Sequence, residues 1–164
     1  MSILTDIVLP SIVVSIIISI IFGVNVLMME SSVETRVTQE LQGFADLATL
    51  VIQEEVRDVH EIVTLNQSLF AFKNAVSDTV LIYRDDRNLV IEKRDGSNSP
   101  TIVSHNVRMS ELNFSTAMVI GSVPVRIRVD VFTESTPAEE VGNRTHRLKA
   151  YSSTELYLRN LNLN

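Results

Sequence analysis

The chain contains no cysteine and no tryptophan among its 164 residues. Without cysteine, no disulfide, thiolate metal ligand or cysteine nucleophile can form. Basic residues are also scarce, because 14 Lys+Arg stand against 20 Asp+Glu and give a formal net charge of −6. That balance argues against a protein that binds nucleic acid through a broad positive field, so no nucleic-acid partner is predicted. The length suits one ordinary domain.

Charge is absent from one long segment near the start of the chain. Between Asp6 and Glu30, residues 7–29 carry no charged side chain. As a helix, this segment would be about 34 Å long, enough to cross a hydrocarbon layer about 30 Å thick. A domain of this size rarely buries a helix that is apolar on every face. We therefore predict that residues 1–30 form a transmembrane or filament-core helix.

A cleaved signal peptide is the less favoured interpretation of this segment. No Lys or Arg precedes Arg36, so a basic leader region is missing. The apolar stretch is too long for the core of a signal peptide, and no A-x-A cleavage site follows it. The orientation stays open, because the positive-inside rule has no positive charges to count near the start. The polar body lies either in the cytoplasm or outside.

Two residues in the apolar segment are unusual for a helix. Pro10 removes one helical hydrogen bond and can kink the first turns. Gly23 lowers helix propensity and allows another helix to approach closely. Either they are simply tolerated, as in many membrane helices, or they mark points where the helix bends or extends on packing. Together with the flanking acids Asp6 and Glu30, they are our candidate self-assembly residues.

Helical periodicity continues beyond Glu30 in an amphipathic form. Apolar residues recur at spacings of three and four from Val33 to Val63, with acids on the other faces. We predict one helix from about residue 3 to about residue 63, with residues 31–63 as its amphipathic half. Residues 1–70 carry nine acids and two bases. This acidic face either lies in solvent or meets basic positions of the later region, in the same chain or in a neighbour.

The remainder of the chain has the pattern of an antiparallel β region. We expect a connection over residues 64–77, with a short helical turn at residues 69–72, followed by a sheet over residues 79–160. The strongest signal is residues 123–132, where apolar and polar side chains alternate. Other strands are expected at residues 79–83, 89–93, 101–104, 107–114 and 147–158, and a polar loop at 133–144.

The fold class that follows is α+β, because the sheet needs a cover and the helix has an apolar face to bury. We predict a β-meander of four to six strands packed against the amphipathic helix, so that residues 31–164 form a head domain. The apolar half of the helix is left projecting from this head.

No catalytic or metal-binding motif is present. His60, His105 and His146 are expected in the helix, a loop and the last strand region, and none has a second ligand at metal-binding spacing. Nucleophile-elbow, phosphate-loop and dinucleotide-binding patterns are all missing. We therefore predict no enzymatic activity, metal or cofactor.

Three Asn-x-Ser/Thr triplets begin at Asn66, Asn113 and Asn143. Such triplets are acceptor sites for N-glycosylation when they lie on a surface loop. Asn143 lies in the predicted polar loop and is the best candidate of the three.

The order of these segments resembles the type IV pilin superfamily, and more closely its minor-pilin or pseudopilin branch. The first shared feature is S-I-L-T-D at residues 2–6, an acid at the start of an apolar helix. The second is the amphipathic continuation at residues 30–59. The third is T-E-L-Y-L-R-N at residues 154–160, similar to the last strand of that branch. In the family the fifth residue of the mature chain is usually Glu, and removal of Met1 would give Asp6 that position.

The resemblance implies a structural subunit of a cell-surface filament. Subunits of this kind wait in the inner membrane as single-pass proteins, and pilus or secretion machinery then draws them into a helical homopolymer. By analogy, Asp6 would pair with the α-amino group of a neighbouring copy. Alternatively, Asp6 caps its own helix or lies at the lipid headgroups. A second function also stays open, a membrane-anchored extracytoplasmic domain that binds a partner in a secretion or adhesion machine.

Overall fold

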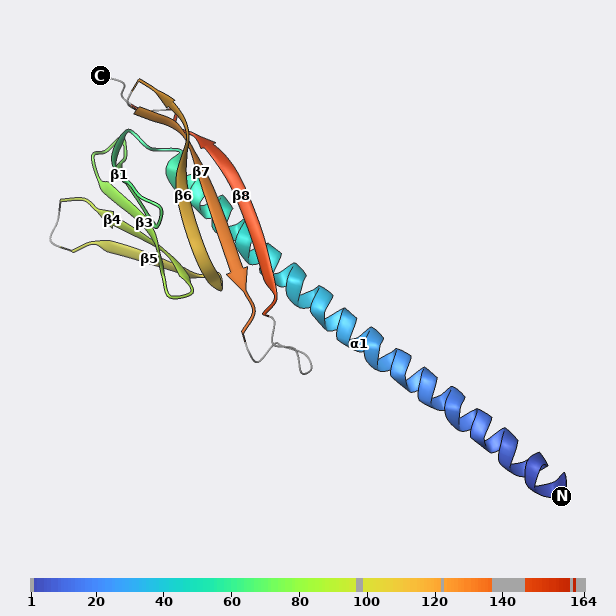
Figure 1. Ribbon diagram of the computed structural model, residues 1–164. Coiled ribbons are helices and arrows are strands. Elements are labelled where there is room, and N and C mark those ends of the chain that lie inside the picture. Colours follow the sequence, from blue (N-terminus) through green and yellow to red (C-terminus); the bar gives the residue numbers. More distant parts are fainter. Residues whose placement is uncertain (1, 97–98, 122, 137–146, 160, 162–164) are drawn as a thin grey trace.

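The computed structural model describes residues 2–96, 99–121, 123–136, 147–159 and 161. Within them the chain forms one helix, α1 (Ser2–Val56), and eight strands. Figure 1 shows that α1 lies against a β-rich head at its C-terminal end and projects far beyond the head at its N-terminal end. Among the described side chains of α1, Val37 is the first that is buried. We call residues 2–36 the stalk.

The helix ends at Val56 and not near residue 63 as predicted. Residues 61–65 form strand β1 (Glu61–Leu65), which pairs with β2 (Leu69–Lys73). The predicted helical turn at residues 69–72 is therefore also wrong. Ile62, Val63 and Thr64 are β-branched and favour an extended backbone. Ile62 and Thr64 pair with β2, and the register shifts between them at Val63.

The strands form two antiparallel sheets in chain order. The first has the order β1-β2-β3-β4-β5, and the second has the order β6-β7-β8. The remaining bounds are β3 (Thr79–Asp85), β4 (Asn88–Arg94), β5 (Thr101–Asn106), β6 (Met109–Ile120), β7 (Val123–Glu134) and β8 (Lys149–Tyr157). The α+β class and the meander connectivity are confirmed. The described residues hold eight strands in two sheets, however, where four to six in one sheet were expected.

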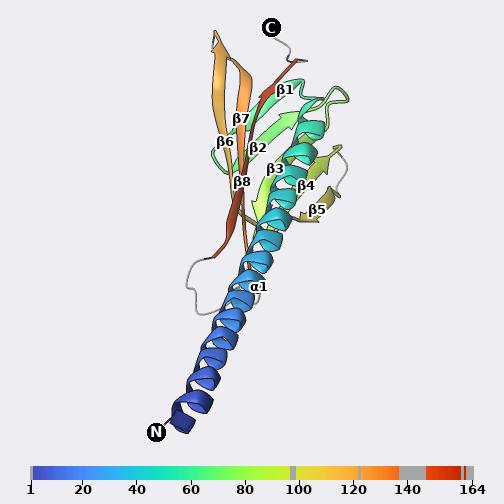
Figure 2. The same cartoon turned by 90° about the vertical axis from the view of Figure 1, so that its right-hand side faces the viewer.

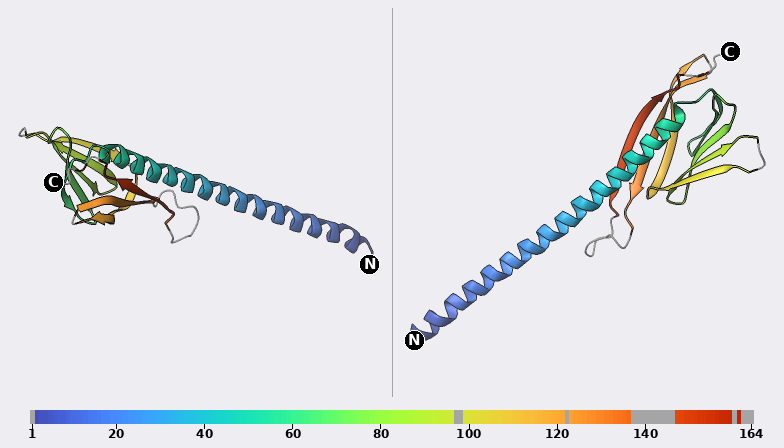
Figure 3. Two further views of the ribbon diagram at one scale, coloured as in Figure 1. Left: turned by 90° about the horizontal axis from the view of Figure 1, so that it is seen from above. Right: turned by 180° about the vertical axis from the view of Figure 1, so that it is seen from behind.

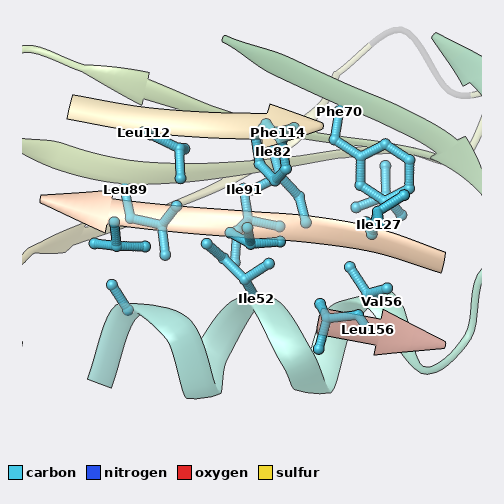
Figure 4. Packing of buried hydrophobic residues seen from close by; sticks show 14 of the residues in the cluster. Ile52, Val56, Phe70, Ile82, Leu89, Ile91, Leu112, Phe114, Ile127 and Leu156 are labelled. Atoms are coloured by element: carbon cyan, nitrogen blue, oxygen red, sulfur yellow. The ribbon is translucent and has the colours of Figure 1, made fainter. Parts of the chain in front are cut away.

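The hydrophobic core is formed jointly by α1 and both sheets. Figure 4 shows Ile52 and Val56 of α1 facing a layer of side chains from the two sheets, including Phe70, Ile91 and Ile127. The alternation predicted for β7 is confirmed, because its apolar residues from Ile127 to Val131 are buried at every second position. The amphipathic half of the helix therefore covers the sheets, as the sequence indicated.

Polar contacts fix the helix against the head where the stalk begins. The buried Thr133 hydroxyl donates to the Leu41 carbonyl at 3.0 Å. Figure 2 shows α1 running alongside β8, where the Gln42 amide donates to the Tyr151 carbonyl at 3.3 Å. These two hydrogen bonds to backbone carbonyls add to the apolar contacts of Val37 and Leu41 at the same place.

Two acids of the helix pair with bases of the β region in the same chain. Lys93 Nζ lies 2.8 Å from a carboxylate oxygen of Glu55, and an Arg108 nitrogen lies 3.5 Å from Glu40. The acidic face of the helix was expected either in solvent or against basic residues. Glu55 and Glu40 contact basic residues of the same chain.

We predict that Ile52→Ala destabilises the head strongly while Leu50→Ala, two residues away on the same helix, does not. Ile52 is fully buried, and its truncation should lower the free energy of unfolding by about 2–5 kcal/mol. Leu50 is 57% exposed, so its truncation should change the free energy of unfolding of the detergent-dispersed protein very little. Urea unfolding of detergent-dispersed protein, followed by circular dichroism, measures both. Equal stability of the two variants would contradict the placement of the core.

Candidate functional site: the projecting helix

Residues 10–29 of the stalk present apolar side chains to their surroundings on every face of the helix. Every residue from 10 to 29 is exposed. The large apolar side chains in this range are exposed by between 40% at Val26 and 71% at Met29. Figure 3 shows this part of α1 standing clear of the head from both directions. The helix is long and apolar enough to cross a membrane.

The polar groups inside the stalk are satisfied by the helix itself. The Ser15 hydroxyl donates to the Ser11 carbonyl at 2.8 Å, and the Ser19 hydroxyl donates to the Ser15 carbonyl at 2.9 Å. Hydroxyl groups bonded in this way need no water and are compatible with lipid or with a helix bundle.

The candidate self-assembly residues lie along this helix. α1 continues through Pro10 and Gly23 without interruption. A Cβ atom added at Gly23 would meet no atom within 4 Å, so the position is open to another helix. Glu30 is half-buried and marks the end of the exposed apolar run. Asp6 has helical backbone, and its side chain lies outside what the structure describes, so its pairing stays a prediction.

A second exposed apolar surface lies on the C-terminal half of α1, on the side of the helix that faces away from the sheets. We call Gly43, Leu47 and Leu50 the outer stripe. Their spacing of four and three residues places them on one side of the helix, opposite the buried Ala45 and Ile52. Leu47 is 48% exposed and Leu50 is 57% exposed. The amphipathic prediction assigned one apolar face to this half of α1 and missed the stripe.

No contact among the described residues explains why position 43 of the helix is a glycine. A glycine within a helix costs about 0.5–1 kcal/mol relative to alanine. A Cβ atom added at Gly43 would meet nothing within 4 Å, so no neighbour among the described residues requires a glycine there. Together with Leu47 and Leu50, it forms a shallow apolar surface suited to close contact with a further helix.

The histidines do not form a site among the described residues. His60 was predicted within the helix, but it lies after the end of α1. Its backbone N–H donates to the Lys73 carbonyl at 2.8 Å. His105 lies on β5 and not in a loop. His146 lies outside the described residues. Within the described part, no group of three or more His, Asp or Glu residues could hold a metal ion.

Of the three glycosylation candidates, Asn66 has the most accessible position in the described chain. It is exposed in the turn between β1 and β2. Asn113 is half-buried on β6, and its amide donates to Glu111 at 2.6 Å. Asn143, the preferred candidate from the sequence, lies outside the described residues.

The outer face of the β6-β7-β8 sheet carries a polar cluster around Asp130. This carboxylate accepts hydrogen bonds from Ser153 at 2.5 Å, Tyr151 at 2.7 Å and Arg128 at 3.0 Å. Burial acts to raise the pKa of Asp130, but the three donors outweigh it and hold the pKa below its ordinary value. All three donors reach the same oxygen, Oδ1, and two of them come from the neighbouring strand β8, which suits a cross-strand tie.

No protein-family model matches the chain, and no curated protein or solved structure matches it significantly. The features of the molecule that bear on its function are the exposed stalk, the outer stripe and the packed head.

We predict that Asp130→Asn lowers stability in a pH-dependent way. A carboxylate whose pKa is depressed by folding stabilises the protein above its unfolded pKa of about 3.9. This contribution is lost as the pH falls through the folded value. The variant should be less stable than the parent by about 1 kcal/mol at pH 7, and the gap should close in strong acid. Urea unfolding at several pH values checks this, and a gap that stays constant down to strong acid would count against it.

Proposed function

We propose that this protein is a structural subunit of a type IV pilus-like filament at the cell surface. The stalks of many copies bundle into the filament core, and the heads form its exterior. The observation that carries the proposal is the exposure of the stalk's apolar side chains on every face, in a chain whose head already has a complete core.

The physical argument concerns where such a helix can be stable. Burying one large aliphatic side chain is worth about 1.5–3 kcal/mol relative to water, and the stalk exposes many of them. A bilayer and a bundle of like helices are the two environments that remove them all from water. A subunit that occupies the bilayer before assembly can exchange lipid for neighbouring stalks.

Small residues on the stalk support helix-to-helix packing in particular. Ser11, Ser15, Ser19 and Gly23 recur every fourth residue, which is the spacing at which small side chains allow helix backbones to approach closely. The outer stripe offers a second contact of the same chemistry at a different height of α1. Contact between two different surfaces of identical subunits propagates from copy to copy, and it builds a helical filament when the rotation between copies does not close into a ring.

The second candidate is a single-pass membrane protein whose head binds a partner. The stalk alone favours it, because its apolar run has the length of a bilayer. This candidate assigns no role to the outer stripe or to the spacing of small residues. The two functions therefore differ in what a change at the stripe does to assembly.

We predict that Leu47→Lys combined with Leu50→Lys abolishes filaments without preventing folding or membrane insertion. Both side chains are exposed, so the dispersed head should tolerate lysine. In a desolvated contact, two unpaired charges cost several kcal/mol, which lowers assembly by more than roughly tenfold. Negative-stain electron microscopy of expressing cells and membrane fractionation provide the readouts.

The matched control is Gln53→Lys, a change at an exposed polar position of the same helix. It should leave filaments intact. Isolation of the native parent protein solely as a membrane-bound monomer would favour the anchored binding module, and normal filaments from the double-lysine variant would exclude the stripe as a contact.

We further predict that Asp6→Lys reduces assembly more than membrane insertion, whereas Asp6→Glu retains assembly. The pairing with a neighbour's α-amino group requires a negative side chain, and lysine would place two positive groups together. Filament yield and membrane-bound protein are quantified from the same cells. A normal yield from Asp6→Lys would refute the pairing.

A further inference from the structure

A two-stranded ribbon extends beyond the second sheet at the end of the head far from the stalk. β6 and β7 remain paired as far as Ile120 and Val123. β8 pairs with β7 only from Arg126 onward, apart from one hydrogen bond from the Leu158 N–H to the Val125 carbonyl. We call residues 118–121, 123 and 124 the ribbon tip. Figures 1 and 2 show it at the opposite end of the molecule from the N-terminus of α1.

The ribbon tip is apolar, and its β6 side is exposed. No charged residue occurs from 112 to 125. Met118, Val119 and Ile120 are 45%, 49% and 55% exposed. Val119 and Ile120 are successive residues in regular register with Pro124 and Val123, so they point to opposite faces, and the described residues leave both of them exposed. Consecutive exposed aliphatic residues of this kind mark interaction sites on folded proteins.

The residues behind the tip form layers of increasing polarity. The first register pair with β8 joins Arg126 and Tyr157, with the guanidinium 4.2 Å from the centre of the ring. Glu155 lies two register pairs farther from the tip but reaches Arg126, whose Nη1 donates to its carboxylate at 2.9 Å. Arg159 follows Leu158 and is exposed. The aliphatic tip is thus followed by the Arg126–Glu155 ion pair, the exposed Tyr157 ring and the exposed Arg159.

We propose that the ribbon tip inserts into a lipid surface, with the exposed Tyr157 and Arg159 at the level of the headgroups. Aliphatic side chains gain from entry into the acyl region, while arginine and tyrosine suit the interface, where phosphate groups accept hydrogen bonds. A folded partner would need a cleft that encloses both faces of the ribbon. Lipid chains surround a projecting ribbon without any preformed cleft.

The position of the ribbon tip determines which lipid surface it reaches. The tip and the stalk point in opposite directions from the head (Figure 3). A chain whose stalk is held in one bilayer therefore presents the tip to a different membrane. This inference does not depend on filament formation, because it concerns a surface of the head that the stalk contact does not use.

The test uses the full chain with its stalk embedded in nanodiscs. These are mixed with vesicles of phosphatidylcholine and phosphatidylglycerol, and co-flotation on a density gradient measures capture. The parent protein should float with the vesicles, whereas empty nanodiscs should not. Val119→Asp combined with Ile120→Asp should weaken capture by roughly tenfold or more, since each buried aliphatic side chain contributes at least that factor.

Two further variants separate insertion from damage to the head. Ile102→Asp places one aspartate at a 58% exposed position on the edge strand β5 and should leave capture unchanged. Val119→Leu combined with Ile120→Leu keeps the aliphatic character and should capture vesicles like the parent. Circular dichroism confirms the fold of each variant.

Absence of capture by the parent protein, or equal capture by the double-aspartate variant, would overturn the proposal. So would self-association of the loaded nanodiscs that depends on Val119 and Ile120 while vesicles are ignored. In that case the tip binds a second copy of the chain.

Discussion

The rest of the structure depends on a single mismatch: one uninterrupted helix passes from a surface that its own chain covers to a surface that its own chain cannot cover. From Val37 to Val56, α1 buries one side against the two sheets. From residue 10 to residue 29 it buries nothing, although its side chains are as apolar as those of the core. The N-terminal half of α1 must therefore obtain its apolar environment from outside the chain, either from lipid or from other copies of the protein.

The continuity of the helix couples the two halves mechanically. Rotation about the helix axis is fixed at the head by the apolar contacts of Val37 and Leu41 and by the Thr133 hydrogen bond to the Leu41 carbonyl. No break in α1 separates these contacts from the stalk. Each face of the stalk therefore has a set direction relative to the sheets and to the outer stripe. If stalks pack side by side, the heads have little freedom in where they lie.

The parts of the fold that the sequence predicts well are those with one strong signal. The charge-free run predicts the stalk, and the alternation around Ile127 predicts β7. The end of α1 was misplaced because Val59, Ile62 and Val63 fit a helical period and are also good strand residues, so only the pairing of β1 with β2 decides between them. Leu69 to Phe72 is a buried strand without alternation, a pattern that local reasoning cannot separate from a short helix.

The outer stripe and the ribbon tip escaped prediction for a related reason. A pattern indicates that a residue is apolar, but only the fold shows which apolar residues remain uncovered. Leu47 and Leu50 lie within an ordinary amphipathic sequence and become conspicuous once Ala45 and Ile52 are seen to occupy the buried side. Met118 to Ile120 lie beyond the strand predicted at residues 107–114, and they become conspicuous once β6 is seen to include them while β8 stops short of them.

The two longest projections of the molecule share a composition that a self-contained globular protein would avoid. The stalk and the ribbon tip both lie in charge-free segments, residues 7–29 and 112–125, and both extend past the elements that could cover them. The head between them buries its core efficiently, so the exposed aliphatic side chains do not result from a shortage of covering surface. Exposure of this kind lowers solubility and offers the isolated chain no stability in return. It is best explained by environments outside the chain at both ends, with the packed head acting as a spacer of defined orientation between them.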